Sequence, residues 1–280
     1  MSEHRDRAPR STDDHGVVAS AVERVRRAGG RLGLSPTETL VAVLGAVAAV
    51  AAVLVIGAIG EDVIEGDGIE RADADRLDLF IAHRSPWLVS ASRALTQLGS
   101  VVVLVPLGLV LATWLWWRGA RLGVALAPFV AMGVAGIVVA ITKAAVGRTR
   151  PPEVLHLVTE EAPSFPSGHS AQSMAFYLAA ALVIAAVVLR RPLVRLFVVV
   201  CAGLFAVMVA LTRLELGVHW PSDVAVGLCI GLASAVAVVG ATVLLVRFDP
   251  VVEEDVPTRR VLLHRIHRAL SSPRPGRRDV

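Results

Sequence analysis

The chain has 280 residues, 55% of them apolar, and a formal net charge of +4 at pH 7. This apolar content is too high for an ordinary soluble domain of that length, so the bilayer is the expected solvent. Nearly all the cations are arginines that flank apolar stretches without interleaved aromatic residues, which fits an anionic membrane surface and argues against nucleic-acid binding. The two cysteines lie inside apolar stretches and have neither metal-ligand nor disulfide-framework spacing.

Six uncharged apolar stretches follow one another along the chain. They cover residues 40–60, 101–117, 122–142, 171–189, 196–211 and 224–246. A helix needs about 20 residues to cross a hydrocarbon core of roughly 30 Å, so most of these stretches can span it with their flanks, and the second and fifth are the shortest. Small residues dominate them and allow close helix contacts, whereas an open sheet could not satisfy its edges in lipid. The expected fold is an all-α, polytopic bundle of six transmembrane helices.

Composition divides the chain into a polar N-terminal segment at 1–36, a membrane domain at 37–247 and a basic tail at 248–280. The first segment has neither a short apolar core nor a small-residue cleavage site, so we expect no signal peptide and a first helix that is retained. With both termini cytoplasmic, twenty of the 28 Lys and Arg residues fall on the inner side and eight on the outer side, as the positive-inside rule requires. The arginine-rich, lysine-poor composition indicates a high-GC bacterium, and hence the bacterial plasma membrane.

Two charged segments flank these stretches. The first outer loop, 61–99, carries eight acidic residues whose spacing does not match an EF-hand loop, so a solvated amphipathic segment is preferred over a calcium site. In the tail, an apolar residue recurs every four positions from Leu262 to Leu270 among arginines, which fits either a basic helix on the inner leaflet or a disordered segment. No protein partner is predicted, and a homodimer is left open.

A cationic segment, KAAVGRTRP, runs from Lys143 to Pro151 at the predicted outer end of the third helix. Lys143 is the only lysine of the chain, and Arg148 and Arg150 follow it. Such cations can be snorkelling anchors, but anchoring cations are scarce on the outer side of a membrane. Arginine offers a fork that matches phosphate oxygens, and lysine offers a compact charge. The segment is therefore a candidate site for a phosphate dianion.

The segment FPSGHS, at 165–170, stands directly before the fourth predicted helix. Ser167 can cap that helix, and Gly168 lets the backbone approach a ligand, so the free amides of the first turn form an anion site. His169 would stand beside the anion and could donate a proton to a leaving oxygen. A capping serine with an incidental histidine is the alternative.

The segment TRLELGVHWPSD, at 212–223, joins the fifth and sixth predicted helices on the same outer side. His219 and Asp223 are four residues apart, and the chain turns between them at Pro221 into a helix start. The carboxylate can then hold one ring nitrogen and raise the nucleophilicity of the other. Zinc is the competing interpretation, but a third ligand and a close histidine pair are missing, so no metal or other cofactor is expected.

The order, common side and complementary chemistry of the three segments resemble the type 2 phosphatidic acid phosphatase superfamily. Its membrane members share their arrangement with soluble acid phosphatases and vanadium haloperoxidases, and the signature reads K-x6-RP, PSGH and SR-x5-H-x3-D. Lys143 to Pro151 match the first part, Pro166 to His169 the second, and Arg213, His219 and Asp223 the third. Thr212 replaces the usual serine but keeps a hydroxyl. The resemblance runs from about the first to the sixth helix and leaves both termini unexplained.

The resemblance implies a lipid phosphate phosphatase that works through a phosphohistidine. His219 would attack phosphorus, Asp223 would orient it, and His169 would protonate the leaving oxygen. The residues implied to stabilise the equatorial oxygens are Lys143, Arg150, Ser167, Gly168 through its amide, and Arg213. Water would then release phosphate without a metal. Three nearby residues receive no assigned role: Arg148, His156 and Glu215.

The main alternative is a six-helix flippase or transporter that binds an anionic headgroup without hydrolysis. Transporters usually place ionisable residues near the midplane, whereas here the apolar spans are free of charge and the polar groups lie at the outer rim. That placement suits a lipid whose tails stay in the bilayer. The substrate is left open among phosphatidic acid, phosphatidylglycerol phosphate and a polyprenyl diphosphate such as undecaprenyl diphosphate.

Overall fold

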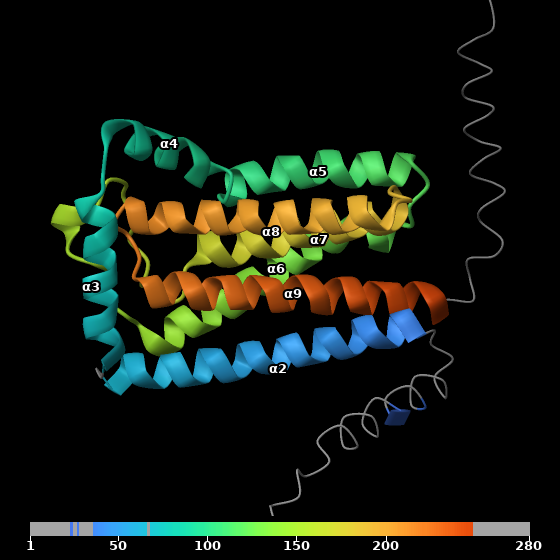
Figure 1. Cartoon of the computed structure of the whole chain (residues 1–280), viewed down its shortest axis with the longest axis horizontal. Helices are drawn as coiled ribbons and strands as arrows, with labels where there is room; N and C mark the ends of the chain where they lie inside the picture. The colour runs from blue at the N-terminus through green and yellow to red at the C-terminus, as the bar shows by residue number, and fades with distance from the viewer. Residues whose placement is uncertain (1–22, 25–26, 28–35, 66–67, 249–280) are drawn as a thin grey trace, which may run out of the picture.

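The computed structural model describes residues 23–24, 27, 36–65 and 68–248 (Figure 1). The basic tail, with its two interpretations, and most of the N-terminal segment lie outside these residues. The domain boundaries at 36/37 and 247/248 therefore stay predictions.

Helices account for most of the described chain from residue 36 onward. They are α2 (Pro36–Glu65), α3 (Gly68–Ala82), α4 (Pro86–Gln97), α5 (Val101–Trp117), α6 (Leu122–Val146), the 3-10 turn η1 (Glu153–Leu155), α7 (Gly168–Val187), α8 (Pro192–Glu215) and α9 (Pro221–Phe248). The described residues contain no strand, and the six apolar stretches fall in α2 and α5–α9. The prediction of an all-α fold is confirmed.

The number of helices that can cross a membrane is close to the prediction. Helices α2, α6, α7, α8 and α9 each contain a segment that is long and apolar enough, while α4 and α5 meet at a bend of 53° and supply a sixth span only as a pair. The short fifth stretch, 196–211, belongs to the 24-residue helix α8, which begins at Pro192 and continues to Glu215. Proline suits a first helical turn because the missing N–H has no partner there anyway.

The helices are arranged so that one end of the bundle carries the polar segments. In Figure 1, α2 and α5–α9 run along the long axis, and α3 lies across the end where α7 and α9 begin and where α6 and α8 finish. Helix α7 packs against α6, α8 and α9 and is the most enclosed of the candidate spans. The segments that carry the three motifs therefore meet at one end of the bundle.

Helices α7 and α9 touch backbone to backbone at the motif end. A Cβ added to Gly227 would lie 2.6 Å from the carbonyl oxygen of Ser167, and one added to Gly231 would lie 2.4 Å from that of Ala171. Both distances are far inside a van der Waals contact, so only glycine fits at these positions. Small residues allow such close packing of apolar helices.

The first outer loop is largely helical, and one of its acids is not solvated. Asp75 and Asp78 on α3 are exposed, as predicted, but Asp73 has 0% exposure and shares the inward face of the helix with the buried Leu77. The prediction of a solvated segment is therefore wrong at Asp73. The physical reason is an ion pair with Arg148, which lies 75 residues away in the chain.

Candidate active site

Four helix ends and two loops build the candidate site. Lys143 lies in the last turn of α6, Arg213 in the last turn of α8, and Asp223 in the first turn of α9. Gly168 and His169 begin α7. The candidate residues thus come from the same end of the bundle, where unpaired backbone groups of helix termini are concentrated.

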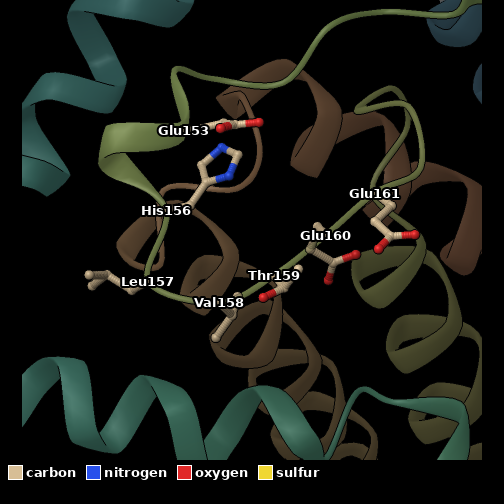
Figure 2. Close-up of a pocket in the computed structure, with 7 residues that line it drawn as sticks. All are labelled: Glu153, His156, Leu157, Val158, Thr159, Glu160 and Glu161. Carbon is tan, nitrogen blue, oxygen red and sulfur yellow. The ribbon is translucent and has the colours of Figure 1, made fainter.

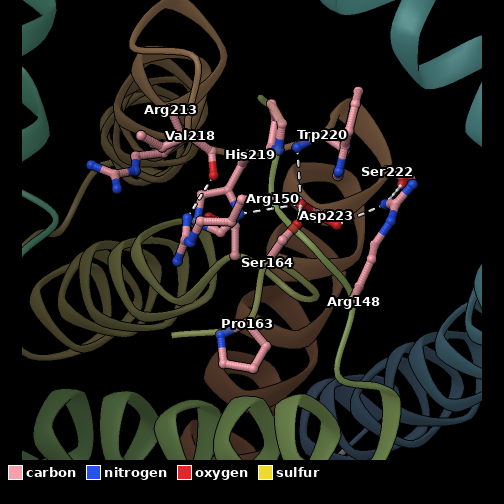
Figure 3. Close-up of polar contacts among 12 residues, drawn as sticks. Arg148, Arg150, Pro163, Ser164, Arg213, Val218, His219, Trp220, Ser222 and Asp223 are labelled. Carbon is pink, nitrogen blue, oxygen red and sulfur yellow. Dashed lines mark hydrogen bonds and ion pairs between the residues drawn. The ribbon is translucent and has the colours of Figure 1, made fainter. Parts of the chain in front are cut away.

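His219 and Asp223 form the predicted pair. Nδ1 of His219 lies 3.2 Å from Oδ2 of Asp223, and both side chains are buried (Figure 3). The same oxygen accepts hydrogen bonds from the Trp220 amide at 2.9 Å and from the Ser164 hydroxyl, while Oδ1 accepts from Arg148 Nη1 at 2.8 Å. Four donors nearly saturate the acceptor capacity of a carboxylate. Asp223 is therefore ionised and fixed in rotation.

The turn before His219 depends on a glycine. Gly217 has φ +71°, and a Cβ there would lie 2.2 Å from the carbonyl oxygen of Leu155. The Leu157 amide also donates to the Leu216 carbonyl at 3.0 Å, so the α6–α7 loop packs directly on this turn. Backbone contact with that loop sets the position of His219.

The other ring nitrogen of His219 faces a cation. Because Nδ1 donates to Asp223, Nε2 carries a lone pair, and Nη1 of Arg150 lies 3.3 Å from it. Burial lowers the pKa of His219 to about 4; Asp223 opposes this decrease, and the charges of Arg213 and Arg150 add to it. The imidazole is therefore neutral at physiological pH, which a nucleophile requires.

Arg150 is held by hydrogen bonds to two loops, the α6–α7 loop and the α8–α9 loop. Its Nε donates to the Ala162 carbonyl at 2.8 Å, and its Nη1 donates to the Val218 carbonyl at 2.5 Å. Burial lowers the pKa of Arg150, but an arginine stays protonated at any physiological pH. A fixed positive charge thus stands beside Nε2 of His219.

Glu160 lies between the two motif arginines. Its Oε1 pairs with Nη2 of Arg213, and its Oε2 lies 3.5 Å from Nη2 of Arg150. Burial raises the pKa of Glu160, but the charges of Arg213, Arg150 and the two motif histidines outweigh it, so the net pKa is lowered. The site therefore already holds one carboxylate on the guanidinium groups that suit a phosphate.

The start of α7 has the predicted cap. Ser167 is the N-cap: its Oγ accepts from the Ser170 amide at 3.4 Å and pairs with the Ser170 hydroxyl at 2.9 Å. Its own amide donates to the Asp223 carbonyl at 3.0 Å, which ties α7 to α9. His169 is partly exposed and has no hydrogen-bond partner for its ring within residues 68–248. Its ring nitrogens are therefore available to a bound group.

Lys143 supports the loop before α7. Its Nζ donates to the carbonyl of Pro163 and lies 3.3 Å from that of Ser164. Because Ser164 is bonded to Asp223, Lys143 contributes to the position of the His–Asp pair as well as to the positive charge of the site. The structure thus joins His219 to Arg150, joins Arg150 to Arg213 through Glu160, and bonds Lys143 to the backbone of the loop before α7.

The pocket beside the site opens over the α6–α7 loop. It has a volume of about 680 Å³ and is lined by Glu153, His156, Leu157, Val158, Thr159, Glu160 and Glu161 (Figure 2). Glu160 borders both this pocket and the two arginines, so it stands between the open side and Arg150 and Arg213. His156 bonds the Pro151 carbonyl at 2.8 Å, which gives it a structural contact in the loop.

Known proteins that are similar to this chain match the part of it that contains the three motif segments. The model of the PAP2 superfamily matches residues 124–246, which contain all three motif segments. The predicted resemblance to this superfamily is confirmed over that part of the chain. Phosphatidylglycerophosphatase B of Bacillus subtilis is 29% identical over 177 residues, which are 60% of this chain and 82% of that protein. Lipid A 1-phosphatase of Rhizobium etli is 33% identical over 132 residues, which are 43% of this chain and 48% of that protein.

A solved structure supports the same assignment. The crystal structure of a transmembrane PAP2-type phosphatidylglycerolphosphate phosphatase from Bacillus subtilis superposes with a TM-score of 0.63 at 26% identity and covers 72% of this chain and 98% of that one. This chain is therefore an integral membrane protein with the fold of that phosphatase.

The PAP2 motifs do not include every residue that builds the site. Asp73, Glu160 and Ser164 bond motif residues directly, and Arg148 has a partner in the third motif. None of the four occupies a signature position or follows a helical period. Only the unusual outward position of Arg148, inside the first PAP2 segment, could have drawn attention to one of them.

Proposed function

We propose that this membrane phosphatase hydrolyses a lipid phosphate monoester or diphosphate at the extracytoplasmic face, without a metal, through a phosphohistidine on His219. The observation that carries the proposal is the geometry around that ring. Nδ1 lies 3.2 Å from Oδ2 of Asp223, and Nε2 lies 3.3 Å from Nη1 of Arg150. A neutral, oriented imidazole beside a guanidinium can approach a phosphate that the guanidinium holds. The balance of Lys and Arg across the membrane supports the outward-facing site.

Substrate binding replaces Glu160 on the two arginines. A phosphate dianion offers more acceptor oxygens and more charge than a carboxylate, so it competes well for Arg150 and Arg213. The amides at the start of α7, capped by Ser167, add donors for a second oxygen. The lipid tails remain in the hydrocarbon region.

The reaction has two steps. His219 Nε2 forms the N–P bond as the P–O bond to the leaving group breaks, and Asp223 stabilises the resulting imidazolium. His169, which takes up a proton when the phosphate dianion binds beside it, gives that proton to the leaving oxygen. Water then attacks phosphorus, loses a proton to His169 and displaces His219 as the N–P bond breaks. Arg150 and Arg213 stabilise the charge on the equatorial oxygens throughout, and such electrostatic stabilisation supplies most of the catalysis in phosphoryl transfer.

The names of the relatives suggest the order in which the candidate substrates should be tested. Phosphatidylglycerophosphatase B makes phosphatidylglycerol phosphate the leading candidate, ahead of phosphatidic acid and a polyprenyl diphosphate. The experiment measures phosphate release from these three lipids by purified protein in detergent with EDTA, with and without vanadate, and uses His219→Ala as the blank. Release that is inhibited by vanadate and lost in the blank is the expected result.

Other outcomes would contradict particular parts of the proposal. Full activity of His219→Ala would contradict the phosphohistidine intermediate, and strict dependence on magnesium would contradict the metal-independent mechanism. Acid-stable phosphate on the protein after a quench, rather than the acid-labile and alkali-stable label of a phosphohistidine, would also contradict it. Headgroup binding without release from any of the three lipids would favour the flippase.

A further inference from the structure

Arg148 lies in the first motif segment but contacts the part of Asp223 that faces away from His219. Its Nη1 is 2.8 Å from Asp223 Oδ1 and 2.8 Å from the Ser222 hydroxyl (Figure 3). Its Nη2 is 2.8 Å from Oδ2 of Asp73. The side chain is only 4% exposed, so it has no surface to offer to a substrate.

Asp73 connects this cluster to α3. The residue is fully buried, its Oδ1 accepts from the Ser222 amide at 2.9 Å, and its Oδ2 accepts from the Ser222 hydroxyl as well as from Arg148. Both oxygens are therefore bonded to α9 or to its partner Arg148. A peripheral helix is tied in this way to the first turn of the helix that carries Asp223.

The cluster controls how Asp223 is oriented. His219 binds Oδ2 and Arg148 binds Oδ1, so rotation of the carboxylate would break an ion pair on one side and the histidine contact on the other. Lysine could not reproduce this arrangement, because a single ammonium lacks the planar fork that bridges two carboxylates from different helices.

The cluster also controls how much negative charge Asp223 presents. Arg148 alone would neutralise Asp223 and weaken its support for an imidazolium at His219. Asp73 shares the guanidinium, so the two carboxylates and one cation leave a net negative charge beside the histidine. The Trp220 ring, 5.5 Å from the guanidinium carbon, covers the cluster and limits screening by water.

We propose that Asp73 and Arg148 are positioning residues that set the orientation and effective charge of Asp223 and thereby the reactivity of His219. The proposal rests on the proposed function, because it assigns a task within the His219 reaction. It predicts that the pair affects the chemical step and leaves substrate binding unchanged.

The test compares Asp73→Asn, Arg148→Lys and the double variant Asp73→Asn/Arg148→Gln in the phosphate-release assay. We expect kcat to fall about 10- to 100-fold in each, the range found for outer partners of metal-binding histidines, with KM within about twofold of the wild type. Asp75→Asn, on the exposed face of the same helix, is the matched control and should keep wild-type constants.

Asp73→Asn separates positioning from stability. It leaves Asp223 and Arg148 as a neutral buried pair, so the thermal midpoint should change little, whereas the double variant leaves Asp223 without a buried cation and should lower the midpoint. We expect Asp73→Asn to keep its thermal midpoint and still to have a low kcat. A fall of kcat only in the variants with a lowered midpoint would overturn the proposal, as would unchanged kcat in all three variants.

A spectroscopic readout distinguishes this inference from the function on which it rests. In protein labelled with ¹⁵N-histidine, Asp73→Asn should shift the His219 ring resonances, assigned by their loss in His219→Gln, and Asp75→Asn should not. Unshifted resonances would reject the inference even if the enzyme is active. A wild type that releases no phosphate would reject the proposed function and leave this measurement interpretable.

Discussion

Arg150 and His219 face each other at 3.3 Å, from guanidinium Nη1 to imidazole Nε2. This relationship joins the cationic segment of the first motif to the proposed nucleophile of the third. A phosphate bound by Arg150 is thus brought to the atom proposed to attack it. The short distance between binding group and nucleophile is the geometry of an oriented attack, in which entropy is lost on binding and not in the chemical step.

Arg150→Lys tests this relationship. Lysine keeps the charge but cannot bond the Ala162 carbonyl, the Val218 carbonyl and a phosphate together. We expect kcat/KM to fall about 100-fold or more, as after loss of one transition-state donor. Steady-state phosphate release gives the value. The control is Arg118→Lys at the opposite end of the bundle, where α5 ends; equal losses in the two variants would show a general effect on folding.

The pH dependence follows from the pKa of His219, which burial lowers to about 4. A lowered pKa means that the neutral, nucleophilic form persists as the pH falls through 6.5 and is lost only near pH 4. We expect the assigned ¹⁵N resonances of His219 to report a neutral ring from pH 8 to pH 5. The direct measurement is needed because the second ionisation of a phosphate monoester, near pH 6, also affects kcat/KM. A protonation midpoint near 6.5 would contradict the buried setting of the ring.

Glu160→Gln removes the carboxylate that lies between Arg150 and Arg213. Without this internal competitor, inorganic phosphate and vanadate should inhibit more strongly, with inhibition constants lower by about tenfold, equivalent to roughly 1.4 kcal/mol. Competition assays against a lipid substrate measure the effect. The exposed neighbour offers the control Glu161→Gln, which should leave the constants unchanged. Weaker inhibition in Glu160→Gln would instead mean that Glu160 assists anion binding.

Gly217→Ala should disturb the turn that places His219. The added Cβ meets the Leu155 carbonyl at 2.2 Å, and φ +71° is unfavourable for alanine, so we expect a loss of stability greater than about 1 kcal/mol together with a lower kcat. Thermal unfolding followed by tryptophan fluorescence measures the first effect. Gly203→Ala is the counterpart on α8, where an added Cβ meets no atom within 4 Å and helix propensity favours alanine. A variant at Gly217 as stable as the one at Gly203 would refute the argument.

The sequence was sufficient to predict the apolar helices, though not α3 and α4, and the pairing of His219 with Asp223, because both depend on local spacing. Apolar runs identify spans in lipid, and an i,i+4 interval at a helix start brings two side chains together. It also predicted the Ser167 cap, which is a contact over three residues.

The contacts that sequence reasoning missed join distant parts of the chain. Asp73 meets Arg148 across 75 residues, and Glu160 meets Arg213 across 53. An acid in a polar loop has the same local pattern whether it is solvated or ion-paired, so only the packing of α3 and of the α6–α7 loop distinguishes the two cases. Arg148 was left without a role for the same reason: its partners lie on two other helices.

The backbone contact between α7 and α9 has a consequence for the host membrane. The helix start that we propose binds the anion and the helix that carries Asp223 are separated by a distance that two glycines set and that no side chain can adjust. Lipids of different chain length can tilt the outer helices or repack their exposed faces without altering that distance. We therefore expect the chemical step to be insensitive to bilayer thickness, so that membrane composition acts on the delivery of substrate and not on its conversion.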